Sequence, residues 1–295
     1  ALDVLPLPRG EPGGRVVGRG RDIRGVFRLV RVKHTLSDWW IDASALVGLV
    51  KWLNTKTNVK TDMNVEGGAL ALRDVGALKS PLLWMTGHDP SFARGMIAGG
   101  RMDSTPGGRF DNNLSDREAA NLRRYLVDRR GLVVFDDCGM TRGTRTPMTE
   151  LFLSQMRHVM PEHGVGRIPR DHILYNVYYQ LGGPPVGFDV FWWGTRPPGR
   201  NYLEGIMIED KLAVIVVRRD YMCAMETVSM PTKHYLPRAS WPVMRWATNV
   251  VMYALTTGNI ADYRDYVPED LLVDEAVPTR APQSARIPPT PLRAR

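Results

Sequence analysis

Two short apolar runs in this chain each stop on polar side chains that could do chemistry. The runs cover residues 82–89 and 131–139. Their polar ends are His88, Asp89, Asp136, Asp137 and Cys138. Buried parallel strands deliver side chains in this way to the carboxyl edge of an α/β sheet. A thiol, carboxylates and an imidazole at one edge could supply a nucleophile with its acid and base, or ligands for a metal ion.

Cysteine catalysis is the first interpretation, with Cys138 as the nucleophile and His88 or His172 as its base. Neighbouring carboxylates raise the pKa of a thiol and so oppose formation of the thiolate. The nucleophile elbow Gly-x-Cys-x-Gly is also missing, because Asp136 stands where its first glycine should be. The simpler interpretation makes Cys138 a small packed residue, Asp136 and Asp137 helix caps or turn formers, and His172 a residue that locks a loop.

A metal site is the second interpretation, since the same histidines and aspartates offer nitrogen and oxygen ligands. The separation of these residues in the sequence forbids a spacing argument. The chain has no His-Glu-x-x-His, paired Cys-x-x-Cys or phosphate-loop glycine pattern. Its two cysteines, Cys138 and Cys223, make neither a zinc-ligand spacing nor a disulfide framework. We therefore predict no metal and no cofactor.

The segment between the two apolar runs is typical of a helix. Ser115 and Glu118 have the spacing of a capping box, while Ala119, Leu122 and Leu126 fall on one helical face. The local pattern is therefore strand, helix, strand. A right-handed crossover would bring the polar ends of both strands to the same edge of the sheet.

Strands and helices also alternate in the rest of the chain. The other predicted elements are a strand at 26–32, a helix capped by Asp42 with Leu46, Leu49, Val50 and Leu53 on its apolar face, short strands or connectors at 58–61 and 69–72, a helix at 147–160, a hairpin of 205–208 and 212–217, and a last helix at 243–257. This alternation predicts an α/β fold with a mainly parallel sheet and helices on both faces.

The two ends of the chain differ in composition from the middle. Residues 1–24 are rich in Gly, Pro and Arg, and residues 261–295 are rich in Pro and end in a basic stretch. Such compositions cannot bury enough apolar surface to fold alone, so we predict extended arms on either side of one α/β domain at 25–260. The arginines expected to meet partner carboxylates or lipid phosphates are Arg280, Arg286, Arg293 and Arg295.

The composition is that of an ordinary globular protein of 295 residues, 43% hydrophobic and 24% charged, with a formal net charge of +8. Arginine predominates over lysine, which can reflect genomic base composition as easily as phosphate binding. An aromatic cluster that includes Trp192 and Trp193 favours a protein interface over nucleic acid. No apolar run approaches the roughly 20 residues that a membrane span needs. The first residue is Ala1, which favours export and removal of a signal peptide.

Five motifs in this order resemble the bacterial domain of unknown function 4159. They are residues 81–88, 114–126, 131–138, 171–172 and 249–256, and the resemblance covers about residues 26–258. It implies a flavodoxin-like, class I glutamine-amidotransferase-like α/β fold, often in exported or membrane-associated proteins, and it brings no established reaction. A Gly- and Arg-rich loop at 91–113 and the long C-terminal arm depart from the family pattern and disfavour an open active site.

These observations favour a non-catalytic accessory subunit that braces a larger membrane-associated complex, respiratory or photosynthetic, from the periplasmic side. Both arms would contact protein subunits, lipid headgroups or both. The alternative is a hydrolase or amidotransferase-like enzyme that uses the cluster of His88, Asp136, Asp137, Cys138 and His172. A third class, a small-ligand or carbohydrate-binding protein, would use the same edge.

Overall fold

The computed structural model describes residues 13–18, 20–63, 70–88, 113–138, 147–187, 201–226 and 237–257. All of them belong to one compact unit, Ala1–Asp265. The predicted C-terminal arm, residues 91–112 of the predicted loop, Asp89, Trp192 and Trp193 lie outside the described residues. Within the described ranges, no helix has the length and apolar character needed to cross a membrane.

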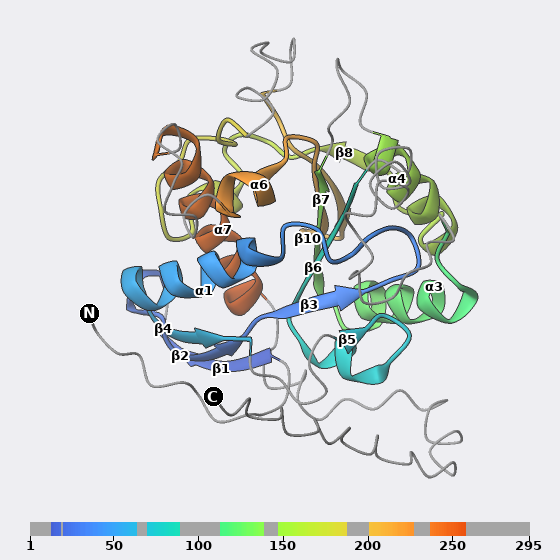
Figure 1. The fold of residues 1–295 in the computed structure, drawn as a ribbon, viewed down its shortest axis with the longest axis horizontal. Helices are drawn as coiled ribbons and strands as arrows, with labels where there is room; N and C mark the ends of the chain where they lie inside the picture. Colours follow the sequence, from blue (N-terminus) through green and yellow to red (C-terminus); the bar gives the residue numbers. More distant parts are fainter. Residues whose placement is uncertain are drawn as a thin grey trace, which may run out of the picture. The chain divides into compact units, whose positions relative to one another are not determined.

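A seven-stranded sheet forms the centre of the fold, in the order β5-β3-β6-β7-β10-β9-β8 (Figure 1). Its strands are β3 (Val30–Lys33), β5 (Leu70–Ala71), β6 (Leu82–His88), β7 (Leu132–Cys138), β8 (Val165–Arg167), β9 (Glu204–Ile208) and β10 (Lys211–Val217). The first five strands in sheet order are parallel, and β9 and β8 each run antiparallel to the strand before them. Taken in chain order, the parallel strands have the order 2-1-3-4-5 of flavodoxin-like folds.

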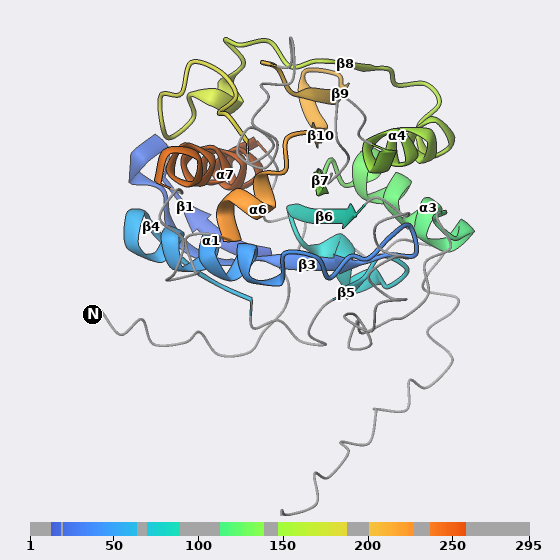
Figure 2. The ribbon, with the colours of Figure 1, turned by 45° about the horizontal axis from the view of Figure 1, so that its top comes forward.

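Helices cover both faces of this sheet (Figures 1 and 2). They are α1 (Ala43–Lys56), α3 (Asp116–Arg123), α4 (Pro147–Val159), α6 (Tyr221–Glu226) and α7 (Pro237–Thr257), with shorter helical turns η1 (Gly20–Asp22), η2 (Val75–Lys79), η3 (Arg124–Asp128) and η4 (Ile173–Tyr175). Helices α1, α6 and α7 pack on one face, and α3 and α4 pack on the other. The predicted α/β fold with a mainly parallel sheet is therefore confirmed.

The strands supply alternate side chains to two hydrophobic cores. In β6, Leu82 and Trp84 face the core under α1, α6 and α7, whereas Leu83 and Met85 face the core under α3 and α4. Successive strand residues point to opposite faces of a sheet, and a sheet covered on both faces needs apolar residues at every position. This explains the continuous apolar runs in the sequence.

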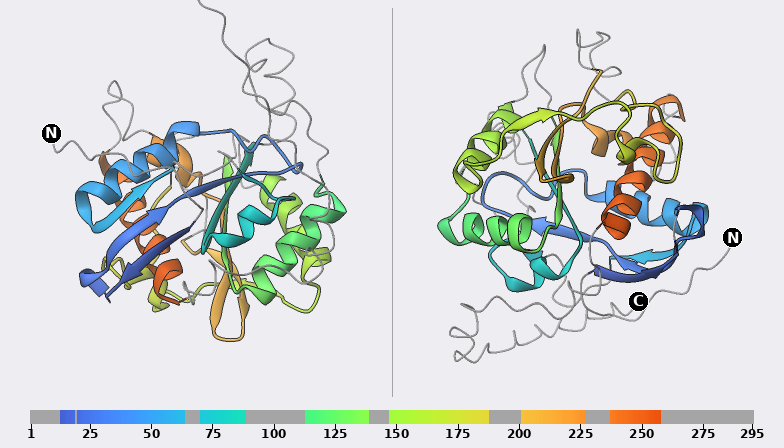
Figure 3. Two further views of the ribbon diagram at one scale, coloured as in Figure 1. Left: turned by 90° about the horizontal axis from the view of Figure 1, so that it is seen from below. Right: turned by 180° about the vertical axis from the view of Figure 1, so that it is seen from behind.

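A smaller sheet of three strands, in the order β1-β2-β4, lies beside α1 and away from α3 and α4 (Figure 3). Its strands are β1 (Gly13–Val17), β2 (Arg24–Arg28) and β4 (Asn58–Asp62). Because β1 pairs with β2, the expected domain boundary at residue 25 falls inside this sheet. The predicted arm at 1–24 therefore contains a paired strand.

The single strand expected at 26–32 is wrong, because the chain changes sheets within it. Strand β2 pairs with β4 in the small sheet, and β3 pairs with β6 in the large one. Leu29 lies at the crossing, fully buried, and its N–H donates to the carbonyl of Asp62 at 2.9 Å. The apolar alternation runs through the crossing without a Gly or Pro, so the sequence carries no sign of the break.

Other local predictions are confirmed with small shifts in their ends. The Ser115 hydroxyl accepts the N–H of Glu118, and the Glu118 carboxylate accepts the N–H of Ser115, which is the predicted capping box. Strands β9 and β10 form the predicted hairpin, with Glu209 at a φ of 56° in its turn. Helix α7 starts at Pro237, earlier than the expected Val243, and contains Pro242.

Candidate functional site

The two polar strand ends lie side by side, as predicted. In the register of β6 and β7, His88 pairs with Cys138 and Gly87 pairs with Asp137. On the other side of β7, Asp136 pairs with Val217, the last residue of β10. The carboxyl ends of three adjacent parallel strands therefore form one edge, at which β7 is the middle strand.

Asp136 and Asp137 are both buried, and each serves the first turn of a different helix. The Asp136 carboxylate accepts the backbone N–H groups of Tyr221 and Met222 at the start of α6. One oxygen of Asp137 accepts the N–H and the hydroxyl of Thr149 in α4, at 2.7 and 2.8 Å. The first N–H groups of a helix have no partner within it, so these carboxylates stabilise the two helix starts. The interpretation of both residues as caps is confirmed.

His172 does not lie near the strand ends. Its Nδ1 accepts the N–H of Leu174 at 3.1 Å, and its ring centroid is 5.7 Å from that of Tyr253. The Tyr253 hydroxyl accepts the N–H of Leu212, at the amino end of β10. A strand of seven residues is about 20 Å long. His172 as a base for Cys138 is therefore wrong, because the two lie at opposite edges of the sheet and His172 is held by its own loop.

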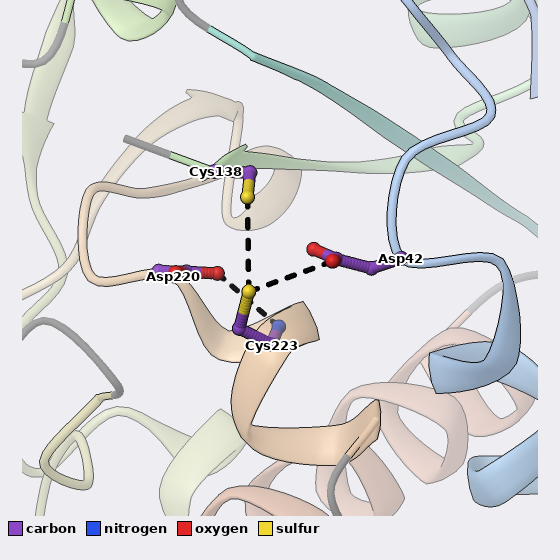
Figure 4. Close-up of side chains that lie close together, drawn as sticks. All are labelled: Asp42, Cys138, Asp220 and Cys223. Carbon is purple, nitrogen blue, oxygen red and sulfur yellow. Dashed lines mark hydrogen bonds between the residues drawn. The ribbon is translucent and has the colours of Figure 1, made fainter. Parts of the chain in front are cut away.

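Cys138 instead meets the second cysteine of the chain (Figure 4). Its Sγ lies 3.7 Å from Sγ of Cys223, in the first turn of α6. Cys138 is buried and Cys223 is partly buried, and both are free thiols. Two carboxylates complete the group: single ligand atoms of Asp42, Cys138, Asp220 and Cys223 all lie within 4.8 Å of one another. We call these four residues the Asp/Cys cluster.

Asp42 enters the cluster because it does not act as the expected helix cap. It occupies the N-cap position of α1, but it has a left-handed backbone, with φ 50° and ψ 48°, and its side chain makes no capping hydrogen bond. Its Oδ1 lies 3.5 Å from Sγ of Cys223 instead. The first turn of α1 is served by Glu226, whose Oε1 accepts the N–H and hydroxyl of Ser44. Helix α1 therefore begins after Asp42, as predicted, but the prediction that Asp42 caps the helix is wrong.

Asp220 is the second carboxylate of the cluster and also has a left-handed backbone, with φ 54°. Its Oδ1 accepts the N–H of Cys223 at 3.2 Å. Its Oδ2 is buried and accepts no hydrogen bond from the part of the chain that the structure describes. A left-handed non-glycine residue is strained by about 1–3 kcal/mol. Both carboxylates of the cluster thus sit on strained backbone, at the starts of two helices.

Burial and mutual proximity govern the protonation of the cluster. The pKa of Cys138 is raised well above its ordinary value by its hydrogen bond to Cys223, by burial and by the nearby carboxylates. The hydrogen bond from Cys138 favours the thiolate of Cys223, but burial and the charges of Asp220 and Asp42 outweigh it, so the pKa of Cys223 is also raised. Burial, together with Asp42 and Asp136, raises the pKa of Asp220. Without a cation, therefore, both thiols of the cluster are protonated at neutral pH.

The buried side chain of Arg31 lies close to the cluster. The Arg31 guanidinium donates to the carbonyls of Trp39, Ile41 and Asp42, at 3.1, 2.7 and 2.9 Å. Burial lowers the pKa of Arg31 to about 10, and the charges of Asp42 and Glu226 oppose that shift. Arg31 therefore holds the backbone that presents Asp42, and its guanidinium contacts carbonyl oxygens rather than the thiols.

Sequence reasoning missed Asp220 and Cys223 as site residues. A usable signal was present, because the apolar run of β10 also stops on polar residues, ending at Val217 with Asp220 and Cys223 close behind. Applying the strand-end rule to the third strand would have found both. Asp42 had no such signal, since Asp before an apolar helical pattern reads as an ordinary cap.

The fold and this edge define a flavodoxin-like α/β domain with a buried thiol and carboxylate cluster at the carboxyl ends of its central strands. A family model described as a domain of unknown function, DUF4159, matches residues 108–255, which is half of the chain. The protein belongs to this family. The matched stretch contains Cys138, Asp220 and Cys223 but not Asp42. A comparison with curated proteins gives no match.

Proposed function

We propose that this protein is a non-catalytic accessory subunit that braces a larger membrane-associated assembly from the periplasmic side. The observation that carries the proposal is at the topological switch point, between β3 and β6. Flavodoxin-like folds bind their ligands in the crevice outside the strand ends at this point. In this chain, the segment after β3, residues 34–39, packs there, and all of its residues except Thr35 are buried.

Contacts with β6 hold this segment in place. The His34 Nε2 is 3.1 Å from the carbonyl of Thr86, to which it donates. Gly87 is closely covered by Ser37: a Cβ at Gly87 would lie 2.6 Å from the Ser37 hydroxyl oxygen. Ser37 is 2% exposed and Asp38 is fully buried. Side chains therefore fill the space next to β6 in which a flavodoxin-like protein would hold a ligand.

A second set of contacts joins the segment to α3. The Glu118 carboxylate, which closes the capping box, also accepts the N–H of Thr35 at 3.0 Å and the Thr35 hydroxyl. The Thr35 hydroxyl is also 2.7 Å from the carbonyl of Asn113. Opening the crevice would break both contacts between Thr35 and the Glu118 carboxylate. This supports a fixed architectural role for the segment.

The surroundings of Cys138 also support a non-hydrolytic role. A nucleophilic thiol needs a base within hydrogen-bond reach, about 2.6–3.2 Å away. Among the described side chains, the groups that gather at the Cys138 thiol are a second thiol and two carboxylates, which keep it protonated. The carboxylates of Asp136 and Asp137 stabilise helix starts, and His172 lies at the opposite edge. The side chain of His88, the other base considered, lies outside the described part of the structure.

An exposed aromatic side chain offers a contact for a partner protein. Trp241, in the first turns of α7, is 53% exposed, and its ring centroid lies 6.4 Å from that of Trp52 in α1. The Lys56 ammonium lies 5.7 Å from the Trp52 ring. Trp is enriched at the centres of protein interfaces, where its burial contributes strongly to binding. In this proposal, the surface of Trp52, Lys56 and Trp241 and the basic stretch at the end of the C-terminal arm each contact a partner.

The proposal is tested by recovering the full-length chain from native membranes in mild detergent. Partner subunits are expected in constant stoichiometry. Deleting residues 278–295 is expected to abolish their recovery without changing the Tm of the isolated subunit. Trp241→Ala is expected to weaken recovery, whereas Ile173→Ala, which removes another exposed apolar side chain, is expected to leave it unchanged. A monodisperse monomer whose arms are cut by protease in native membranes would overturn the proposal.

The alternative, a hydrolase or amidotransferase-like enzyme, has one observation in its favour. Cys138 ends a strand at the carboxyl edge of a flavodoxin-like sheet, where enzymes of α/β folds carry reactive groups. The reaction of Cys138 with iodoacetamide separates the two functions. A protonated, buried thiol reacts slowly at pH 7, and fast alkylation with a midpoint below pH 7 would support the enzyme.

A further inference from the structure

We propose that Asp42, Cys138, Asp220 and Cys223 bind one divalent cation of the zinc class, with both sulfurs and one oxygen of each carboxylate as ligands. The four ligand atoms already lie within 4.8 Å of one another, although they come from three distant parts of the chain (Figure 4). This site is independent of the role proposed for the subunit, since a catalytic or an accessory protein can contain it.

The distances within the cluster fit a tetrahedral ion. Zinc lies about 2.3 Å from thiolate sulfur and about 2.0 Å from carboxylate oxygen, so a tetrahedron has edges of about 3.8 Å between two sulfurs and about 3.5 Å between sulfur and oxygen. The Sγ atoms of Cys138 and Cys223 are 3.7 Å apart, and Sγ of Cys223 is 3.5 Å from Oδ1 of Asp42. These two distances match edges of a zinc tetrahedron, and all four ligand atoms lie within 4.8 Å of one another.

Asp220 gives an independent reason to expect a ligand. Asp220 is only 2% exposed, and its Oδ2 accepts no hydrogen bond from any described group. A buried carboxylate oxygen without a donor is unfavourable by about 1–3 kcal/mol, more if it is charged. Figure 4 shows the Asp220 side chain directed toward Cys223, within the cluster. A cation held by the cluster would satisfy this oxygen.

The donor set selects the class of ion. Two thiolates are soft ligands that Mg²⁺ and Ca²⁺ avoid, whereas Zn²⁺ takes both sulfur and carboxylate oxygen. Four protein ligands in a buried place are typical of a structural zinc site, which keeps no open position for substrate. Binding of Zn²⁺ would replace the thiol protons, so two protons would be released from Cys138 and Cys223 for each ion bound.

The position of the cluster indicates what the ion would do. Asp42 starts α1, Cys138 ends β7, and Asp220 and Cys223 start α6. An ion would join these three segments at one edge of the sheet and hold the two strained aspartates in place. We therefore expect the bound metal to stabilise the fold, with Tm rising as the ion concentration rises.

Cobalt gives a direct test, because the chain has only two cysteines and both belong to the cluster. The full-length protein, purified with reductant and freed of metal by a chelator, is titrated with Co²⁺. We expect one Co²⁺ per chain, with a thiolate-to-cobalt charge-transfer band and the intense visible bands of a tetrahedral ion. Zn²⁺ is expected to displace the cobalt stoichiometrically and to protect both thiols from iodoacetamide.

Matched variants assign the ligands. Asp220→Asn and Cys223→Ser are each expected to weaken Co²⁺ binding at least about 100-fold, since loss of even an outer-shell partner weakens metal binding 10- to 100-fold. Asp210→Asn, which neutralises an exposed aspartate in the hairpin turn, is expected to bind as the wild type does. Thiol protection by Zn²⁺ in the wild-type protein tests the site even if a variant fails to fold.

Two results would overturn the proposal. A native protein whose mass is lower by two hydrogens, and which binds no Co²⁺ after reduction, would mean that Cys138 and Cys223 form a disulfide. A reduced protein that binds no Co²⁺ and whose thiols Zn²⁺ does not protect would mean that the 3.7 and 3.5 Å contacts are only hydrogen bonds of protonated thiols. Neither result bears on partner recovery, which tests the accessory role.

Discussion

The Glu226 carboxylate accepts both the N–H and the hydroxyl of Ser44, at 3.4 and 2.6 Å. Glu226 ends α6 and Ser44 lies in the first turn of α1, so residues 182 positions apart share one helix start. This contact does for α1 what an N-cap ordinarily does. The Asp42 side chain makes no capping hydrogen bond, and its carboxylate meets Cys223 instead.

Removing this distant cap should destabilise the protein. Glu226→Ala is expected to lower the free energy of unfolding by about 1–2 kcal/mol, as loss of a cap does. Ser44→Ala should have a smaller effect, because the Ser44 N–H keeps its acceptor. Urea unfolding of both single variants and the double variant gives their coupling energy, expected near 1 kcal/mol. Additive effects would show that the contact contributes nothing to stability.

The two neighbouring aspartates of β7 should differ in their response to substitution. Asp136 uses both oxygens for two backbone N–H groups, so in Asp136→Asn one N–H of α6 would face an amide nitrogen. The free energy of unfolding is expected to fall by about 1–3 kcal/mol. Asp137 uses a single oxygen for Thr149, which the amide oxygen of Asp137→Asn can replace. Asp137→Asn is therefore expected to lower the free energy of unfolding by less than Asp136→Asn. Equal losses in urea unfolding would contradict this account.

The unit from β6 to β7 could be predicted because its signals are local. Ser115 and Glu118 are three residues apart, and each apolar run ends on its polar residues within one or two positions. Parallel strands joined by a right-handed crossover end at the same edge of the sheet, so the polar ends of both strands are expected to meet there. This is why the pairing of His88 with Cys138 agrees with the sequence pattern.

The Asp/Cys cluster could not be predicted as a whole because its contacts are distant in sequence. Cys138 and Cys223 are 85 positions apart, and Cys223 and Asp42 are 181 apart. No spacing rule connects such residues. The left-handed backbone of Asp42 is also set by tertiary contacts, since Arg31 holds its carbonyl and Glu226 takes its place as cap. The pattern Asp followed by a helix is the same in either conformation.

Gly131 opens the β7 motif for a steric reason. A Cβ at this position would overlap the ring of Tyr125, which is fully buried and whose hydroxyl donates to the carbonyl of Leu132 at 3.2 Å. The ring therefore has little room to move. Gly131→Ala is expected to lower the free energy of unfolding by at least about 2 kcal/mol.

The matched control for this change is Gly166→Ala in β8, where no heavy atom of the described residues, apart from the two chain neighbours, lies within 4 Å of the added carbon. It is expected to change stability by less than about 0.5 kcal/mol. Thermal unfolding of the two variants beside the wild type measures the difference. A Gly131→Ala protein as stable as the Gly166→Ala protein would mean that Tyr125 can repack.

His34 should make the protein sensitive to acid. It is 5% exposed, and burial lowers its pKa from 6.5 to about 4, against the opposing effects of Glu118, the Thr86 carbonyl and Asp38. Between pH 4 and 6.5 the unfolded chain therefore binds more protons at this position than the folded one, so stability rises with pH across that window and is lost on acidification.

The stability that His34 loses on acidification amounts to about 3 kcal/mol, because a change of one in pKa corresponds to about 1.4 kcal/mol. His34→Gln keeps a donor for the Thr86 carbonyl but cannot take up a proton. Urea unfolding of both proteins at several pH values from 7 to 4 should therefore show that the variant loses less stability than the wild type, by up to about 3 kcal/mol. If the two proteins lose stability in parallel over this range, then His34 is not buried in its neutral form, and the segment at 34–39 does not fill the switch point as a fixed part of the core.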